Sequence, residues 1–443
     1  MTRLALVCGL LVVAASPASA DDGQSASPDE ISGLSSTSSS IGPASGLAPI
    51  SIVEGPGIKV GEGTVLHPII GLETGFVSNA FYEDTNPRAT GILRLVAQVA
   101  TASLSPDRLA TPASDAEIAE NTGSLQYRAS LRLSYDFYLS GNDSLQEQGG
   151  LGVGALFRGT IRPQSTWSFR YLENFERVIR ATNFESPSRT NRDINRLQLG
   201  IQFAPQGRTL SALLHYENLI DFFEDEDQRF ANRMHNTVGF TLNWRFRPVT
   251  VFFGEVTQGF FSGLGAASTK ISSFPLTVAT GVQTLLSLKT SIVGRVGYTN
   301  GFYSSGPNYS AVLGGLQFGY RYSETGRFTL MYEYLHQDSI NANFYRDHAI
   351  KAQLEQQFAP FLLTVEPEFR IRQYQGVSMV IPGPDIRDDV ILAVTAGLRY
   401  NFRKSLAAIA EYRLSSVQTD YMSAGDDPSY VRHEAVLGVR AAL

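Results

Sequence analysis

The chain has 443 residues, of which 43% are hydrophobic and 18% are charged, and its formal net charge is −6. It contains 40 glycines, 26 phenylalanines and 19 tyrosines, but only two tryptophans and one cysteine. This composition favours β-structure rich in aromatic residues and tight turns, and it argues against a helical enzyme. The slight acidic excess gives no reason to expect nucleic acid as a partner.

Residues 1–20 have the organisation of a secretory signal peptide. Arg3 is followed by an apolar run of about a dozen residues and then by small residues that end at Ala20. The run is shorter than the roughly 20 residues that a membrane-spanning helix needs. We therefore expect cleavage after Ala20, which would also remove Cys8, the one cysteine of the chain.

Residues 21–64 form a second zone, with Ser-Ser-Thr-Ser-Ser-Ser at positions 35–40 and many glycines and prolines. This composition predicts a low-complexity, flexible segment on the periplasmic side. A simple linker is one interpretation, and a segment that docks onto a partner is the other.

From residue 65 onward, apolar and polar residues alternate. Between Leu125 and Leu139 every odd position is apolar, and the even positions are almost all polar. A period of two is typical of a β-strand whose two faces meet different surroundings. Residues 361–376 and 388–403 repeat the pattern. These runs exceed the roughly 5 to 6 residues of most strands in globular proteins, which argues against an ordinary sandwich.

The alternating runs predict an all-β fold, a transmembrane antiparallel up-and-down β-barrel of about 18 strands over residues 65–443. Tight connections alternate with longer ones, as expected for short periplasmic turns opposite long external loops. No segment from residue 67 onward is a uniformly apolar run long enough for a membrane helix. The predicted strands are 67–78, 89–104, 122–139, 148–161, 165–180, 191–204, 208–221, 235–247, 249–261, 272–286, 288–300, 309–323, 327–339, 346–359, 361–376, 388–403, 405–418 and 429–443.

One segment adds a family resemblance. Residues 71–81, Gly-Leu-Glu-Thr-Gly-Phe-Val-Ser-Asn-Ala-Phe, resemble the opening strand of an outer-membrane β-barrel porin family associated with exopolysaccharide export. In that family a glycine-rich strand leads into an asparagine and an aromatic residue. The resemblance implies a bacterial outer-membrane protein that moves polysaccharide with the help of periplasmic co-polymerase and export proteins.

The sequence offers little for catalysis or metal binding. The six histidines lie in six different segments, and neither a zinc-protease spacing nor a Gly-x-Ser-x-Gly elbow is present. We expect no catalytic residues, no metal and no cofactor. The acidic run from Glu224 to Asp227 is interpreted as a solvated charged loop, with a divalent-cation site as the alternative.

The polar face of the predicted strands holds the candidate functional residues, because it carries more basic than acidic side chains. Arginine suits the binding of carboxylate and phosphate oxygens, and rings of charge set the ion preference of pores. Alternatively, the same charges form cross-strand salt bridges that brace the wall. Two arginine pairs on adjacent strands, at 370 and 372 and at 399 and 403, are expected to form a local basic ladder. The candidates for lumen lining and selectivity are Arg128, Arg132, Arg370, Arg372, Arg399, Arg403, Glu366 and Glu368.

The sequence thus predicts passage across the outer membrane rather than catalysis. Export of an exopolysaccharide is the first hypothesis, a general or solute-selective diffusion porin the second, and a barrel-embedded hydrolase the third. Expected partners are outer-membrane lipid and lipopolysaccharide, an anionic polysaccharide, and periplasmic or inner-membrane export proteins. Lipid-facing and subunit-facing surfaces are both apolar, so the pattern does not determine the oligomeric state.

Overall fold

The structure is a computed structural model, and nearly all of the chain that it describes is β-strand. The predicted signal peptide and most of residues 21–64 lie outside the described part. None of the helices in that part is long and apolar enough to cross a membrane. The described residues are 57–61, 64–102, 124–178, 191–205, 209–376, 386–403, 405–420 and 428–442.

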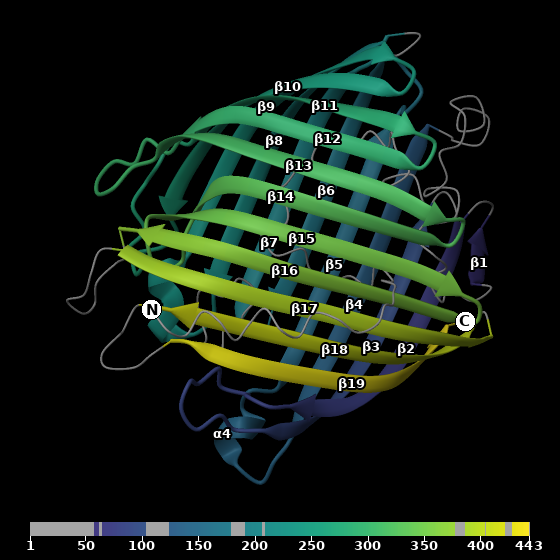
Figure 1. Cartoon of the computed structure of the whole chain (residues 1–443), viewed down its shortest axis with the longest axis vertical. Coiled ribbons are helices and arrows are strands. Elements are labelled where there is room, and N and C mark those ends of the chain that lie inside the picture. The colour runs from purple at the N-terminus through teal and green to yellow at the C-terminus, as the bar shows by residue number, and fades with distance from the viewer. Residues whose placement is uncertain are drawn as a thin grey trace.

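The strands form one 19-stranded antiparallel sheet (Figure 1). Two short helical segments, α4 (Asp143–Gln146) and η2 (Glu226–Ala231), lie in the connections. The strands are β1 (Ile58–Gly61), β2 (Thr64–Val77), β3 (Thr90–Ala102), β4 (Leu125–Leu139), β5 (Gly150–Ile161), β6 (Trp167–Val178), β7 (Arg192–Phe203), β8 (Leu210–Phe223), β9 (Arg233–Arg247), β10 (Thr250–Gly263), β11 (Leu276–Ser287), β12 (Thr290–Asn300), β13 (Ser310–Ser323), β14 (Gly326–Asp338), β15 (Phe344–Phe358), β16 (Phe361–Gln375), β17 (Ile386–Arg403), β18 (Leu406–Thr419) and β19 (Tyr430–Ala442).

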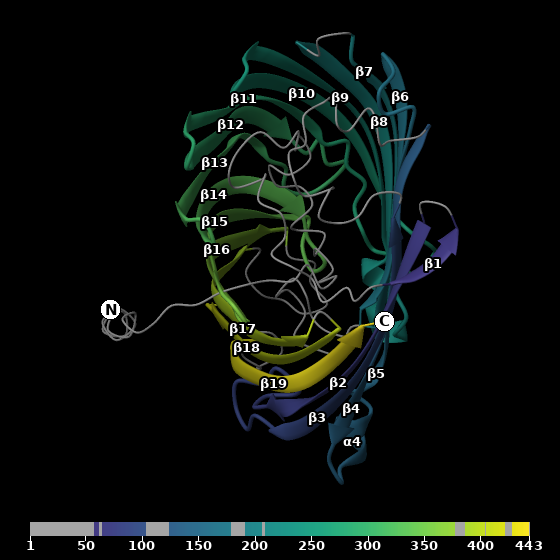
Figure 2. The same ribbon diagram turned by 90° about the vertical axis from the view of Figure 1, so that its right-hand side faces the viewer.

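Strands β2 to β19 close into a barrel. Each pairs with its neighbours in the chain, and β19 returns to pair with β2, for example through Ala435 and Phe76. Figure 2 shows the strands as an elongated ring, with β6 to β9 along one long side and β13 to β16 along the other. Closure leaves no free sheet edge, so the strand backbones can be hydrogen-bonded without water. The predicted 18-stranded antiparallel barrel is therefore confirmed.

Each of the predicted strands has an observed counterpart, and the bounds differ by only a few residues. The strand that the sequence did not predict is β1, which pairs with the start of β2 through Ile58 and Leu66. It lies within the segment interpreted as low-complexity. A strand of four residues contains only two repeats of the alternating pattern. Two repeats are too few to distinguish a strand from irregular sequence.

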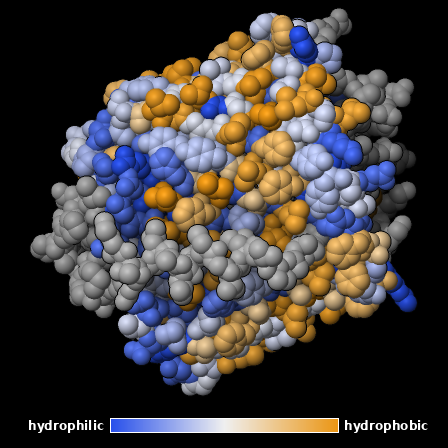
Figure 3. All heavy atoms as spheres, in the orientation of Figure 1, coloured by the Kyte–Doolittle hydropathy of each residue, from blue (hydrophilic) through white to orange (hydrophobic). Residues whose placement is uncertain are grey.

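Large apolar side chains are exposed on the outside of the barrel. On β4, Leu131 is 47% exposed and Phe137 41%, whereas the intervening Asp136 is 2% exposed. Figure 3 shows apolar residues spread across the middle of one outer face. This arrangement reverses that of a water-soluble protein, and it is the one expected of a barrel whose outer wall contacts lipid. The chain thus has the architecture of a bacterial outer-membrane barrel.

Aromatic rings gather on the outer wall beside the short turns. The rings of Trp167 and Phe203 lie 4.8 Å apart, and those of Phe361 and Tyr400 are also 4.8 Å apart. Aromatic girdles of this kind lie at the boundary between lipid and water. The short-turn end therefore marks one membrane interface.

The asparagine of the family-like segment anchors the first long connection. The side-chain amide of Asn79 is buried and donates to the backbone oxygens of Glu83 (2.7 Å) and Val431 (3.2 Å). Its oxygen accepts from the backbone amide of Glu83 at 3.0 Å. Asn79 thereby ties the connection to β19 at the seam where the barrel closes.

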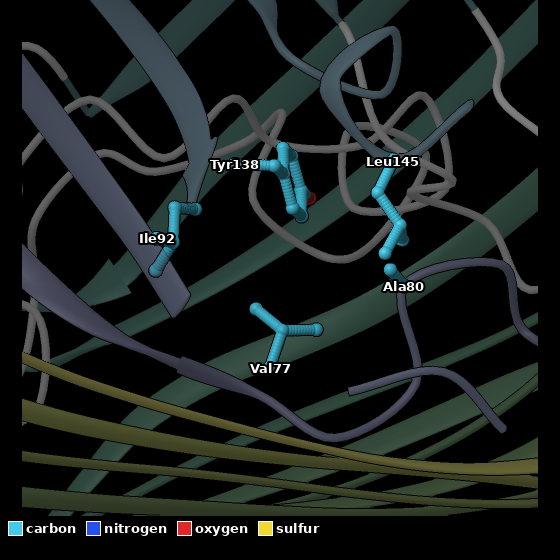
Figure 4. Packing of buried hydrophobic residues seen from close by; sticks show 5 residues of the cluster. All are labelled: Val77, Ala80, Ile92, Tyr138 and Leu145. Carbon is cyan, nitrogen blue, oxygen red and sulfur yellow. The ribbon is translucent and has the colours of Figure 1, made fainter. Parts of the chain in front are cut away.

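Nearby, a small apolar cluster joins this connection to the one that carries α4 (Figure 4): Val77, Ala80, Ile92, Tyr138 and Leu145.

A pair of substitutions on β17 tests which face meets lipid. Leu392 lies near the middle of β17 on the outward face, opposite Phe369, whereas Thr395 lies on the inward face. We expect Leu392→Arg to destabilise the barrel by about 2–4 kcal/mol, because it buries a charge in hydrocarbon, and Thr395→Arg to be tolerated. Urea unfolding in lipid vesicles would measure both. Equal damage from the two substitutions would contradict the assignment of faces.

Candidate functional site

The inward face of the barrel carries the charged side chains of the strands. Seven of the eight candidate residues lie on this face, because each alternates with outward neighbours. The exception is Arg403, which follows a register shift in β17 and is opposite Leu406 on the outward face. The seven range from buried to partly buried. The difference follows from their partners, which separate into clusters towards the long-loop end and a strip at the short-turn end.

Asp347 of β15 holds two of the candidate arginines. Arg372 donates to both carboxylate oxygens at 2.7 Å, and Arg370 donates to one at 3.0 Å. The guanidinium carbon of Arg372 lies 3.8 Å from the ring centroid of Tyr345 and 5.8 Å from that of Tyr374. Arg372 is fully buried. A two-pronged ion pair stacked on aromatic rings fixes the guanidinium rigidly, so these groups are part of the wall.

The candidate glutamates of β16 have different neighbours. Glu368 contacts Arg370 and lies 3.8 Å from the ammonium of Lys351. Glu366 accepts a hydrogen bond from the amide of Gln353 at 2.8 Å. The structure therefore joins Glu368 to the cluster around Asp347, whereas Glu366 is bound to Gln353 of β15.

The expected ladder of Arg370, Arg372, Arg399 and Arg403 is wrong. Strands β16 and β17 are antiparallel, and Arg399 lies opposite Leu362 near the turn, whereas Arg372 lies opposite Asp389 near the far end. Arg399 shares the inward face of Arg370 and Arg372 but lies towards the opposite end of the strands, and Arg403 leaves that face after a register shift. Spacing within each strand showed the shared face, but only the register shows the separation along the barrel axis and the bulge.

A second cluster spans the closing seam of the barrel. Arg94 of β3 donates to Asp136 at 2.7 Å, to Glu73 at 3.2 Å and to Glu434 at 3.1 Å. Arg440 donates to Glu73 at 2.7 Å. The cluster thus links β19, β2, β3 and β4. Of the candidate residues, Arg132 lies on the same inward face of β4 as Asp136, and it is partly buried.

A third cluster lies at the long-loop end of β7 to β9. Asp221 accepts two hydrogen bonds from Arg192, at 2.6 and 2.8 Å, and one from Arg233 at 2.9 Å. All three residues are buried. The arginines escaped the sequence analysis because they stand at strand ends, where the period of two fades. Glu73 and Arg94 of the second cluster were missed for another reason, since glycines at positions 71 and 75 obscure the polar face.

Four connections fold together over part of the long-loop end, and we call residues 224–232, 264–275, 301–309 and 339–343 the loop bridge. Phe223 of β8 packs on Ala231 and on Ile340, the latter between β14 and β15. Arg233 of β9 donates to the backbone oxygen of Asp338 on β14 at 3.4 Å. Because β9 and β14 are not neighbours in the barrel, these contacts cross the lumen.

Buried polar contacts stabilise the loop bridge. The ammonium of Lys270 donates to the backbone oxygens of Ser339 (2.7 Å) and Ala342 (3.1 Å). The hydroxyl of Tyr303 donates to the Asp338 carboxylate at 2.5 Å. Burial, together with this carboxylate, raises the pKa of Tyr303 well above its usual range, so the phenol remains a donor. The bridge is therefore a packed part of the fold.

The acidic run of the sequence lies at the edge of the loop bridge. Glu224 forms an ion pair with Arg177 at 2.7 Å, whereas Glu226 and Asp227 in η2 are exposed. Within the described residues, no group of histidine, cysteine and acidic side chains is arranged to hold a metal ion.

The short-turn end of the lumen has a different charge pattern. Among the inward positions in the few strand residues beside the short turns, the described chain holds a single carboxylate, Glu355, which pairs with Arg327. Of the candidates, Arg128 is partly buried and Arg399 is 6% exposed. The other arginines on this strip are Arg158, Arg170, Arg245, Arg321 and Arg440, of which Arg440 is paired with Glu73. Arg247 and Arg403 follow register shifts and are opposite the outward Thr250 and Leu406. Positive charge thus dominates this end.

No family model and no curated protein sequence matches the chain. Similar solved structures include OccK2 (OpdF) of Pseudomonas aeruginosa, with 11% identity, a TM-score of 0.46, and coverage of 86% of this chain and 98% of that one. OccAB4 of Acinetobacter baumannii has 10% identity and a TM-score of 0.43, with 85% and 98% covered. The outer membrane protein OpdK of P. aeruginosa has 7% identity and a TM-score of 0.44, with 85% and 99% covered. The likeness is distant and carries no information about a solute.

The third cluster gives a stability prediction. Asp221→Asn removes the carboxylate that compensates two buried guanidinium groups, and we expect the barrel to lose about 3–5 kcal/mol of stability. Asp227→Asn, the same change at an exposed position of η2, should leave stability within about 0.5 kcal/mol of the parent. Urea unfolding would measure both. A small effect at Asp221 would show that the cluster is not structural.

Proposed function

We propose that this protein is a passive outer-membrane channel for small solutes and that it prefers anions. The observation that carries the proposal is the arginine-rich strip at the short-turn end of the lumen, where Arg158 and Arg170 are exposed. Inward charge of one sign in a water-filled barrel raises the local concentration of counter-ions and sets the sign of the preferred ion.

The proposal assigns different roles to the arginines of the lumen. Arg370 and Arg372 are held by Asp347, so their charge is neutralised locally and they brace the wall. Arg128 and Arg158 lie on the arginine-rich strip, where carboxylates are scarce at the strand positions, and they act on passing ions. The sequence allowed two interpretations of the lumen charges, as salt bridges that brace the wall or as charges that act on ions. In this proposal the first applies towards the long-loop end of the barrel and the second at the short-turn end.

The loop bridge supports passage of small solutes in preference to a polymer. Its contacts cross the lumen from β9 to β14, and they are maintained by apolar packing and by buried hydrogen bonds. A partition of this kind narrows the external opening and obstructs a thick polysaccharide chain more than a small ion. We therefore favour a solute-selective diffusion channel over the exopolysaccharide export that the family resemblance implied.

Channel recordings test the proposal. In a planar bilayer with a KCl gradient, the reversal potential should have the sign of chloride preference. Arg245→Gln should shift it towards cations, because it removes a positive charge from the strip. The control is Arg229→Gln, which removes a charge from an exposed position of η2 on the loop bridge and should shift the potential less. A cation-preferring parent channel would overturn the proposal.

A further inference from the structure

Three arginines lie together on the inward face of β4, β5 and β6, and we call them the arginine triad. Arg128 of β4 is directly opposite Arg158 of β5 in the register. Arg170 of β6 is opposite Thr160, two residues from Arg158 on the same face. Side chains directly opposite one another in antiparallel strands have Cβ atoms about 4.5–5.5 Å apart, and diagonal neighbours are within reach of long side chains. The three guanidinium groups can therefore converge.

Such a pairing works against the stability of the sheet. Like charges directly opposite each other repel, whereas an acidic residue at either position would attract. The other strand positions opposite the triad are Ala102, Leu172, Thr160 and Gly200. The paired strand positions themselves thus place no carboxylate beside the three arginines. Elsewhere in the lumen the arrangement is the reverse, as Asp347 and Asp221 show by each holding two arginines.

The outer wall behind the triad offsets this repulsion. Tyr127, Phe157 and Tyr171 are the chain neighbours of the three arginines and point outward. Their rings form a continuous row, with centroids 6.5 Å apart between Tyr127 and Phe157 and 5.5 Å apart between Phe157 and Tyr171. Cross-strand aromatic packing stabilises a register. The row therefore holds the arginines together despite their like charge.

The triad is open to the lumen. Arg158 and Arg170 are exposed and Arg128 is partly buried, in contrast to the fully buried Arg372. Gly200, opposite Arg170, has no side chain to fill the space beside the guanidinium. A solute that reaches this end of the barrel meets three positive groups on one patch of wall.

We propose that the arginine triad is a binding site for small oxyanions that carry two or more negative charges, such as phosphate or a di- or tricarboxylate. Guanidinium groups bind carboxylate and phosphate oxygens through paired N–H donors, and several oxygens are needed to engage three such forks at once. A chloride ion offers one charge and no such geometry. The inference deepens the proposed function, on which it rests, because it names the class of anion that is retained at the short-turn end.

Block of the chloride current by added anions tests the site. Inorganic phosphate or citrate, added on the short-turn side of the reconstituted channel, should reduce the chloride current in a saturable way. The monovalent anion gluconate should give no saturable block of the chloride current. Replacing Arg128 with glutamine removes one charge-assisted contact, so we expect the concentration for half-block to rise about tenfold or more. If neither phosphate nor citrate blocked the current in a saturable way, the proposed site would be refuted.

Two further measurements separate the triad from general positive charge. Arg245→Gln removes a charge from the same end on β9, outside the triad, so it should weaken chloride preference while the concentration for half-block changes less than twofold. Arg128→Gln should also raise the temperature at which the barrel unfolds, because it relieves the repulsion with Arg158. Equal weakening of the block by both variants would show a diffuse field and no site. If the parent channel prefers chloride but shows no saturable block, the site is refuted and the proposed function stands. If the parent channel does not prefer chloride, the proposed function itself is refuted.

Discussion

The need to hydrogen-bond every backbone group in lipid governs this structure. Lipid offers no partner to a free strand edge, so a sheet within a membrane has to close on itself. Here β19 meets β2 along a seam from Ala442 and Ile69 to Glu434 and Val77, and the remaining strands follow in chain order. Once the sheet is closed, each residue of a strand faces either lipid or the lumen. The distribution of charge inside the barrel follows from that division.

Closure also explains why the charges form compact clusters. A polar side chain excluded from the outer wall has to find its partners within the lumen, and an unpaired charge in a poorly hydrated place is costly. Towards the long-loop end, Asp347 and Asp221 each compensate two arginines, and Arg94 is shared by three carboxylates. These networks connect neighbouring strands and hold the seam. At the short-turn end carboxylates are scarce, and Arg158 and Arg170 remain exposed to the lumen.

The connections complete this asymmetry. On one side of the barrel the loop bridge joins strands that are not neighbours, with hydrogen bonds from Lys270 and Tyr303 within it. On the other, Asn79 fastens the first connection to β19. The long-loop end is thus reinforced by side chains and folded connections, whereas the short-turn end keeps a basic surface. In the proposed anion channel, the loop bridge narrows one opening and the basic short-turn end retains the anions.

The sequence by itself determined the strands and the side that each residue faces. The period of two is a local property, because successive side chains of a strand point to opposite faces whatever its neighbours are. Leu131 could therefore be placed outside and Asp136 inside before any fold was known. The same rule placed seven of the eight candidate residues in the lumen correctly, and it failed for Arg403, which follows a register shift. It failed for β1, which is too short to show a period, and at strand ends such as Arg192 and Arg233.

Only the tertiary structure decided which charges meet. Register between strands depends on turn geometry and on packing across the sheet, neither of which an alternating pattern specifies. This is why Arg372 lies against Asp347 and far from Arg399, and why Arg128 lies opposite another arginine. The loop bridge, likewise, joins segments whose meeting depends on the curvature of the closed sheet. The side of the sheet that a residue faces is set by its position along the strand, whereas the residues that it contacts on other strands are set by the register and by closure of the barrel.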